Sequence, residues 1–175
     1  MVKAIFLDRD GVINKARLVN KIPCPPQNID EVILLPKVHE ALQMLKNAGY
    51  LLIVVTNQPD VARGNVDIKK VEAINNFLKA TLPLTDIFTC YHDDKDKCNC
   101  RKPNPGNILE AVDRYHISIE ESFMIGDRWR DVEAGQRAGC ETFFIDYGYD
   151  EKQPLDYTYK VKSLYEASEI ILKNN

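Results

Sequence analysis

The sequence predicts an α/β protein with a doubly wound, mostly parallel sheet and helices on both faces. Short apolar runs alternate with segments of helical periodicity along almost the whole chain, as in parallel sheets whose strands are joined by helices. The apolar runs are rich in branched residues, which is typical of strands covered on both faces. A length of 175 residues suits one core, so we expect a single domain over 1–175.

The N-terminal half contains the clearest elements. Val2–Leu7 is almost entirely apolar and predicts a buried strand. Pro36–Ala48 has apolar residues at helical spacing, with proline at its start and Gly49 just after its end, so it predicts a helix. Tyr50–Val55 is a continuous apolar run and predicts a strand. Asp67 is a suitable N-cap for a second helix.

The C-terminal half continues the alternation. The predicted elements are a weak strand over Ile87–Thr89, a helix over Ile108–Tyr115, a strand over Phe123–Ile125, a helix over Val132–Ala138, a strand over Thr142–Ile145 and a helix over Ser163–Lys173. Two long segments, 14–35 and 90–106, are expected to be irregular. Loops of that length in a compact domain are usually functional.

Composition narrows the class of protein. The formal net charge is −3 and no long block of one sign occurs, which argues against nonspecific binding to nucleic acid or a membrane surface. The first apolar run is too short for a signal peptide, and no apolar stretch reaches membrane-spanning length. We therefore expect a cytoplasmic monomer that binds neither nucleic acid nor membrane.

Two acids follow the first predicted strand directly. Asp8 and Asp10 precede Gly11, so both should stand at the carboxyl end of a strand, where open α/β sheets bind ligands. Two carboxylates without a basic partner would repel each other. A divalent cation would remove that conflict and would screen a phosphate that a carboxylate attacks. The alternative is simple turn or N-cap chemistry, because Asp-Gly is common in turns.

Three later segments favour the chemical interpretation. Thr56-Asn57-Gln58 ends the second predicted strand and offers a hydroxyl and amides that can hold a phosphate oxygen. Arg101-Lys102 precedes a proline, and a lysine there would neutralise a transferring phosphoryl group. Gly126-Asp127-Arg128 ends another strand, and Asp127 would complete a Mg²⁺ site, since Mg²⁺ prefers oxygen ligands. Each segment alone could be a turn, solvated charge or a helix cap; their common position at strand ends favours one site.

A cysteine cluster predicts a second metal. Cys90-x-His92 and Cys98-x-Cys100 place three thiolates and one imidazole within eleven residues, a closed tetrahedral set for structural Zn²⁺. The chain has five cysteines, an odd number, and reduced thiols holding a metal fit better than disulfides. The alternative is a group of reactive or merely buried cysteines. A zinc ion here would pin the loop that delivers Arg101 and Lys102.

These motifs together resemble the haloacid dehalogenase superfamily of phosphohydrolases over residues 1–150. The resemblance implies a Rossmann-like fold of that type, with a zinc-stapled loop. It implies that Asp8 is the nucleophile, that Asp10 is the general acid and base, and that Thr56 and Lys102 hold the phosphoryl group. Mg²⁺ would be bound by Asp8, the Asp10 backbone carbonyl and Asp127. The gaps between the motifs leave no room for a separate cap domain, so loops should shape the pocket.

Within that superfamily the chain resembles the D-glycero-D-manno-heptose 1,7-bisphosphate 7-phosphatases. The motifs that carry this resemblance are DRDGVIN at 8–14, TNQ at 56–58, ARG at 62–64, the zinc loop, and CRKPNPG at 100–106. Two features differ: the zinc loop has the spacing of histidinol-phosphate phosphatases, and Pro59-Asp60-Val61 replaces a small, glycine-containing stretch. The resemblance implies a phosphorylated sugar substrate in carbohydrate metabolism, on the route to a lipopolysaccharide precursor. Its predicted substrate contacts are Asn57, Gln58, Arg63, Arg101 and Arg128.

Several alternatives remain open at this point. Histidinol phosphate or another small sugar phosphate could be the substrate. A phosphoacceptor receiver domain also has acids, a threonine and a lysine at strand ends, although its phosphoacceptor ends an inner strand where this chain has Thr56. A zinc-stabilised nucleic-acid-binding module is disfavoured by the net charge and by the lack of a basic aromatic face.

Overall fold

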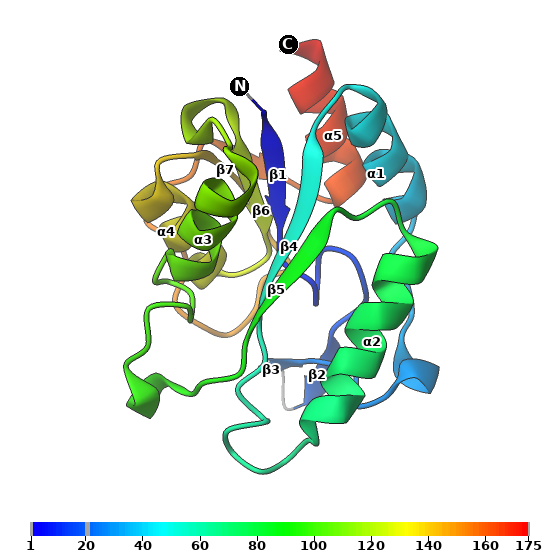
Figure 1. Ribbon diagram of the computed structural model, residues 1–175, viewed down its shortest axis with the longest axis vertical. Helices are drawn as coiled ribbons and strands as arrows, with labels where there is room; N and C mark the ends of the chain where they lie inside the picture. Colours follow the sequence, from blue (N-terminus) through cyan, green and yellow to red (C-terminus); the bar gives the residue numbers. More distant parts are fainter. Residues whose placement is uncertain (1, 20–21, 175) are drawn as a thin grey trace.

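A six-stranded parallel sheet with strand order β5-β4-β1-β6-β7-β8 forms the centre of the computed structural model, which describes residues 2–19 and 22–174 (Figure 1). Its strands are β1 Ala4–Leu7, β4 Leu51–Asn57, β5 Asp86–Cys90, β6 Phe123–Gly126, β7 Glu141–Ile145 and β8 Tyr159–Val161. The helices are α1 Val38–Asn47, α2 Ile68–Thr81, α3 Gly106–Tyr115, α4 Trp129–Ala138 and α5 Leu164–Lys173. The predicted doubly wound architecture is confirmed.

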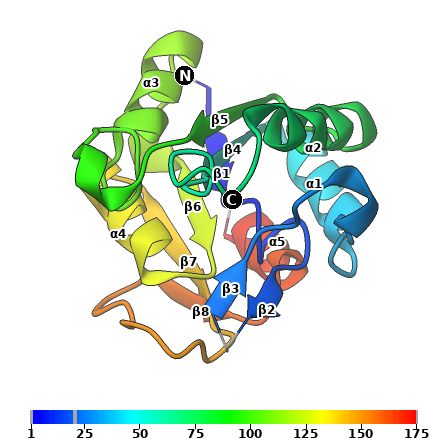
Figure 2. The same cartoon turned by 90° about the horizontal axis from the view of Figure 1, so that it is seen from below.

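Helices cover both faces of the sheet. Side chains alternate along each strand, so Ile5 and Leu7 of β1 pack with α1, α2 and α5, whereas Ala4 and Phe6 pack with α3 and α4. Figures 1 and 2 show these two helical layers on opposite sides. Both faces of β1 are therefore buried, which explains why its sequence is an unbroken apolar run.

The segment 14–35 contains more regular structure than the sequence indicated. β2 Arg17–Val19 and β3 Ile22–Cys24 form an antiparallel pair, and a 3-10 helix covers Ile29–Glu31. The pair lies below the carboxyl ends of the sheet (Figures 1 and 2). Three-residue strands are too short to show a periodicity, and Pro23 within β3 argues against a strand except in an edge position such as this one.

Other differences lie at element ends. β8 was not predicted, because a three-residue strand carries no pattern of its own. β5 extends beyond the predicted Ile87–Thr89 at both ends. α4 begins at Trp129 rather than Val132, since its first turn is polar and is capped by the Asp131 side chain, which accepts a hydrogen bond from the Arg128 backbone. None of the helices in the described ranges is both long and apolar enough to cross a membrane.

The strand order determines where the polar side chains meet. β1 lies between β4 and β6, so Asp8 after β1, Thr56 near the end of β4 and Asp127 after β6 come to the same edge of the sheet. The carboxyl edge of a parallel sheet is where open α/β folds bind ligands. The β2–β3 pair and the loop between β5 and α3 then border this edge.

Candidate active site and metal-binding loop

Lys102 joins the acids at the carboxyl edge of the sheet. Its Nζ lies 2.7 Å from Asp8 Oδ1 and 2.6 Å from Asp131 Oδ1, and it donates to the Val55 carbonyl at 2.6 Å. The lysine is only 1% exposed. A buried ammonium needs such partners, and here three oxygen atoms provide them. The same contacts fix its position beside Asp8.

Three carboxylates outnumber this one buried cation. Oxygen atoms of Asp8, Asp127 and Asp131 lie within 4.8 Å of one another, and all three residues are buried. Burial raises the pKa of Asp8 to about 6, although Lys102 acts in the opposite direction. Burial, followed by repulsion from Asp8 and Asp131, raises the pKa of Asp127 well above its usual value. A divalent cation among these oxygens would reverse both effects.

The contacts of Asp127 support a cation at this position. Its Oδ2 accepts a hydrogen bond from the Tyr149 hydroxyl at 2.9 Å, whereas its buried Oδ1 has no hydrogen-bond partner among the described residues. An unpartnered buried carboxylate oxygen is costly unless a cation or water meets it. Asp131 differs, because its Oδ1 meets Lys102 and its Oδ2 accepts from the Arg128 backbone. The donor set therefore fits Mg²⁺ through Asp8 and Asp127.

Two glycines allow the acids to approach the strands. A Cβ atom on Gly11 would lie 2.0 Å from Asp127 Oδ2, and a Cβ atom on Gly126 would lie 2.0 Å from Asp131 Cβ. Gly11 also has a φ of +95°, which few other residues adopt. A side chain at either position would displace an acid of the cluster, so both positions require glycine. At Gly11 the backbone conformation of the turn favours glycine as well.

Asp10 is held by a network of side chains. Its Oδ1 accepts from Asn14 Nδ2 at 2.9 Å, and its Oδ2 accepts from Gln58 Nε2 at 2.8 Å. The fully buried Arg9 donates to both oxygens. Gln58 Nε2 also lies 2.9 Å from Thr56 Oγ1, so Gln58 connects the threonine to Asp10. These contacts define the orientation of the Asp10 carboxylate.

Asn57 fixes the backbone of Lys102. Its Nδ2 donates to the Lys102 carbonyl and its Oδ1 accepts from the Lys102 amide, both at 3.1 Å. This reciprocal pair ties the end of β4 to the loop that precedes α3. The loop therefore presents Lys102 from a fixed backbone.

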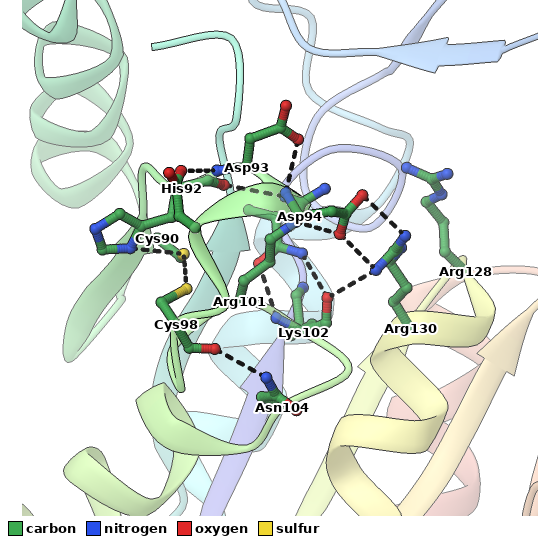
Figure 3. Close-up of polar contacts among 12 residues, drawn as sticks. Cys90, His92, Asp93, Asp94, Cys98, Arg101, Lys102, Asn104, Arg128 and Arg130 are labelled. Carbon is green, nitrogen blue, oxygen red and sulfur yellow. Dashed lines mark hydrogen bonds and ion pairs between the residues drawn. The ribbon is translucent and has the colours of Figure 1, made fainter. Parts of the chain in front are cut away.

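The predicted zinc ligands come together in that loop. Cys90, His92, Cys98 and Cys100 each offer a ligand atom within 4.8 Å of the others. Neighbouring Sγ atoms lie 2.9–3.7 Å apart, and His92 Nδ1 lies 3.3 Å from Cys100 Sγ. A tetrahedral zinc with bonds of about 2.3 Å to sulfur separates its ligands by about 3.8 Å. Three sulfurs and one imidazole at these separations fit Zn²⁺. Figure 3 labels three of these residues, Cys90, His92 and Cys98.

Carboxylates of the same loop bind arginines from three parts of the chain. Asp94 Oδ1 accepts from Arg101 Nε at 2.9 Å and from Arg130 Nη1 at 3.2 Å (Figure 3). Asp93 Oδ1 binds Arg63 at 2.7 Å. The loop thus connects the segment after β4, through Arg63, to the start of α4, through Arg130. Arg128 instead pairs with Glu151.

One cavity brings together half of the predicted active-site residues, namely Asp8, Asp10, Asn57, Lys102 and Arg128. Its lining also includes Arg130, Asp131, Ala16, Pro23 and Cys24 of β3, and Pro25 directly after β3. Thr56 and Gln58 are buried and are not among the lining residues. Gln58 donates hydrogen bonds both to Thr56 and to Asp10, and Asp10 lines the cavity. Arg63 and Arg101 are bound to the loop carboxylates Asp93 and Asp94. Their predicted contacts with substrate stay predictions.

Sequence reasoning missed four residues that shape this site. Arg130 lies two residues after a predicted contact, but nothing in its local pattern marks it. Asp94 lies inside the zinc loop, and its charge alone resembles solvated surface. Tyr149 and Glu151 lie more than twenty residues after Asp127, in a segment without a predicted element. Tyr149 contacts Asp127 and Glu151 contacts Arg128 only because the folded chain packs that segment against the site.

Comparison with known proteins places this geometry in a family. Residues 25–139 match the family of haloacid dehalogenase-like hydrolases. The chain is 32% identical over 183 residues to a D-glycero-α-D-manno-heptose-1,7-bisphosphate 7-phosphatase of Photorhabdus laumondii, with 97% of each chain covered. It is 36% identical over 144 residues to a D-glycero-β-D-manno-heptose-1,7-bisphosphate 7-phosphatase of Helicobacter pylori, with 78% of this chain and 79% of that protein covered.

A solved structure agrees with these relatives. The crystal structure of D,D-heptose 1,7-bisphosphate phosphatase from B. bronchiseptica, complexed with magnesium and phosphate, superposes with a TM-score of 0.80 at 28% identity. The match covers 99% of this chain and 100% of that one. This family assignment favours a phosphatase over the receiver-domain and nucleic-acid-binding alternatives. The chain belongs to the haloacid dehalogenase-like hydrolases and is a phosphatase.

Proposed function

We propose that this phosphatase removes the 7-phosphate of D-glycero-D-manno-heptose 1,7-bisphosphate with Mg²⁺ and through an aspartyl phosphate. The observation that carries the proposal is the pairing of a nucleophile with a buried cation: Lys102 Nζ lies 2.7 Å from Asp8 Oδ1. A carboxylate must approach an anionic phosphate to attack it, and fixed positive charge at that point lowers the barrier. The cavity that Asp8 lines gives a substrate access.

In the proposed first step an Asp8 carboxylate oxygen attacks phosphorus and the bond from phosphorus to the sugar oxygen breaks. Asp10 gives its proton to that leaving oxygen. In the second step Asp10 takes a proton from a water molecule that attacks the phosphorus. The acyl phosphate bond breaks, inorganic phosphate leaves and the Asp8 carboxylate is restored. The contacts of Asp10 with Arg9, Asn14 and Gln58 would hold it in place for both transfers.

Asp8, the Asp10 backbone carbonyl and Asp127 would hold Mg²⁺. The unpartnered Oδ1 of Asp127 supports this assignment. Bound there, Mg²⁺ would neutralise charge on the phosphoryl oxygens as Asp8 approaches. We assign Asp131 a different role, because both its oxygens are occupied: it positions Lys102. Thr56 and Lys102 would contact the transferring group.

The number of guanidinium groups at and beside the cavity supports a bisphosphate substrate, and each of them is paired with a carboxylate of the chain that a second phosphate would replace as partner. Arg128 and Arg130 line the cavity in addition to Lys102. Arg101 is not among the lining residues, but its guanidinium group shares the Asp94 carboxylate with that of Arg130. One phosphoryl group does not require this number of cations. A second, distant phosphate would bind these guanidinium groups, with Arg63, Arg101 and Arg128 as predicted contacts and Asn57 and Gln58 supporting the site. The relatives named above act on heptose bisphosphates of both anomers, so we propose no anomer.

For the zinc loop we propose a structural Zn²⁺ on Cys90, His92, Cys98 and Cys100. All four side chains point at one another, and the loop positions Asp94 as well as Arg101 and Lys102. The ion would support catalysis only through the loop that it folds.

The test is phosphate release by the purified protein from heptose 1,7-bisphosphate, with and without Mg²⁺. Asp8→Asn keeps the shape but removes the nucleophile, and it should retain less than about a thousandth of wild-type kcat. Asp113→Asn, an exposed carboxylate on α3, is the matched control and should keep full activity. A clearly active Asp8→Asn variant would refute the covalent mechanism. A kcat/KM for histidinol phosphate equal to that for the bisphosphate would refute the substrate assignment.

A further inference from the structure

We propose that Tyr149 is a positioning residue for the Mg²⁺ site, because it fixes which oxygen of Asp127 faces the metal. This inference rests on the proposed function and extends it to a residue outside the motifs. The Tyr149 hydroxyl donates to Asp127 Oδ2 at 2.9 Å. The other oxygen, Oδ1, is buried and lacks a hydrogen-bond partner within the described part of the chain.

The two oxygens of Asp127 are thus unequal. A carboxylate at the end of a strand can rotate about its terminal bond, and without a fixed partner either oxygen of Asp127 could face the metal. A donor on Oδ2 removes this freedom and leaves Oδ1, which has no hydrogen-bond partner in the described part of the chain, as the oxygen available to a metal held between Asp127 and Asp8. Donors behind a metal ligand orient it and typically change metal affinity by about 10- to 100-fold when they are lost.

The segment that carries Tyr149 contacts the site at three points. Tyr147 donates its hydroxyl to the Gly11 carbonyl at 2.9 Å, and Gly11 is the residue whose missing Cβ leaves room for Asp127. Tyr149 binds Asp127, and Glu151 pairs with Arg128. The rings of Tyr147 and Tyr149 lie 5.6 Å apart. Segment 147–151 therefore contacts both the turn after β1 and the turn after β6 and holds them in a fixed relative position.

Packing in the core does not account for this arrangement. Tyr147 is 44% exposed, and both tyrosines line a second cavity together with Gly11, Lys15 and Arg17. Apolar burial would favour phenylalanine as much as tyrosine at these positions. The feature that distinguishes Tyr149 is its hydroxyl, and that hydroxyl contacts a predicted metal ligand.

The experiment compares Tyr149→Phe with wild type by two measurements on the zinc-loaded protein. The first is Mg²⁺ affinity by isothermal titration calorimetry without substrate. The second is the Mg²⁺ concentration for half-maximal phosphatase activity. We expect both to increase by about tenfold or more, with kcat at saturating Mg²⁺ within about twofold of wild type. Tyr157→Phe is the matched control: its ring packs on Phe144 in the same part of the chain, and both values should stay unchanged.

The outcomes separate this inference from the proposed function. If Tyr149→Phe binds Mg²⁺ as tightly as wild type, the positioning role is wrong and the phosphatase mechanism is unaffected. If wild type binds Mg²⁺ but releases no phosphate from the bisphosphate, the proposed substrate fails, and the calorimetric comparison still decides the role of Tyr149. A wild type that binds no Mg²⁺ overturns both. A lower melting temperature in Tyr149→Phe with unchanged Mg²⁺ affinity would indicate a merely structural tyrosine and would also refute the inference.

Discussion

Asp94 of the zinc loop and Arg130 of α4 lie within hydrogen-bonding distance, with Arg130 Nη1 3.2 Å from Asp94 Oδ1. The same Oδ1 binds Arg101 Nε at 2.9 Å. One carboxylate therefore orients two guanidinium groups, and Arg130 also reaches the Lys102 carbonyl at 3.4 Å. The loop that contains the four zinc ligands is connected in this way to Arg130, which lines the cavity; Figure 3 shows the contacts between Asp94, Arg101 and Arg130.

Removal of this carboxylate tests whether it orients a substrate-binding surface. Asp94→Asn should raise KM for the bisphosphate by about 10- to 100-fold, since charged hydrogen bonds contribute roughly 1.5–3 kcal/mol, and it should leave kcat nearly unchanged. Arg101→Ala should raise KM to a similar extent. Steady-state kinetics on both variants provides the measurement. If kcat falls instead and KM does not change, Asp94 and Arg101 support the transferring group rather than the remainder of the substrate.

Lys102 should have the opposite kinetic effect. It contacts Asp8 directly, where charge changes most during phosphoryl transfer, so Lys102→Ala should lower kcat by about a hundredfold or more. Removal of a buried cation also leaves Asp8 and Asp131 without their partner, so thermal unfolding should be recorded beside the kinetics. The control is Lys79→Ala on α2, whose partner Asp86 lies at the far end of β5. A Lys102→Ala variant that folds and keeps more than a tenth of wild-type kcat would contradict the assignment.

The sequence was sufficient to locate Asp8, Thr56, Lys102 and Asp127, because three of them end or directly follow strands with strong apolar patterns. The parallel arrangement then requires these ends to meet at one edge. The cysteine cluster was visible because its four ligands are local. Both kinds of signal depend only on neighbours along the chain.

Residues joined by tertiary packing alone could not be found in this way. Tyr149 and Glu151 meet Asp127 and Arg128 across more than twenty residues, and no periodicity marks them. Arg9 was assigned no role from the sequence, and the structure shows it fully buried and donating to Asn75 on α2. β2, β3 and β8 have three residues each, which is too short for a pattern to form.

Gly11 should tolerate no side chain. Gly11→Ala places a Cβ atom 2.0 Å from Asp127 Oδ2 and must displace that carboxylate, so activity should fall by about a hundredfold or more, in line with misplaced catalytic groups.

Gly49→Ala is the matched control: its φ of +91° is similar, and no atom lies within 4 Å of the added Cβ. It should cost about 1 kcal/mol of unfolding free energy from backbone strain with full activity retained. Equal activity loss in both variants would show that backbone strain, and not the contact with Asp127, is responsible.

The zinc loop provides the last prediction. Protein purified without added chelator should contain about one zinc per chain by elemental analysis, and Cys98→Ser should lose most of it, because thiolate ligands supply much of the binding free energy. The melting temperature should fall as well, since binding at a structural site is coupled to folding of the loop. Cys140→Ala is the control: this cysteine is buried just after the end of α4 and lies outside the cluster, so zinc content should not change. Because Asp94 and Lys102 depend on the loop, Cys98→Ser should also show a raised KM and a lowered kcat together. Metal-free wild type with full activity and an unchanged melting temperature would show that the four ligands meet without holding a structural ion.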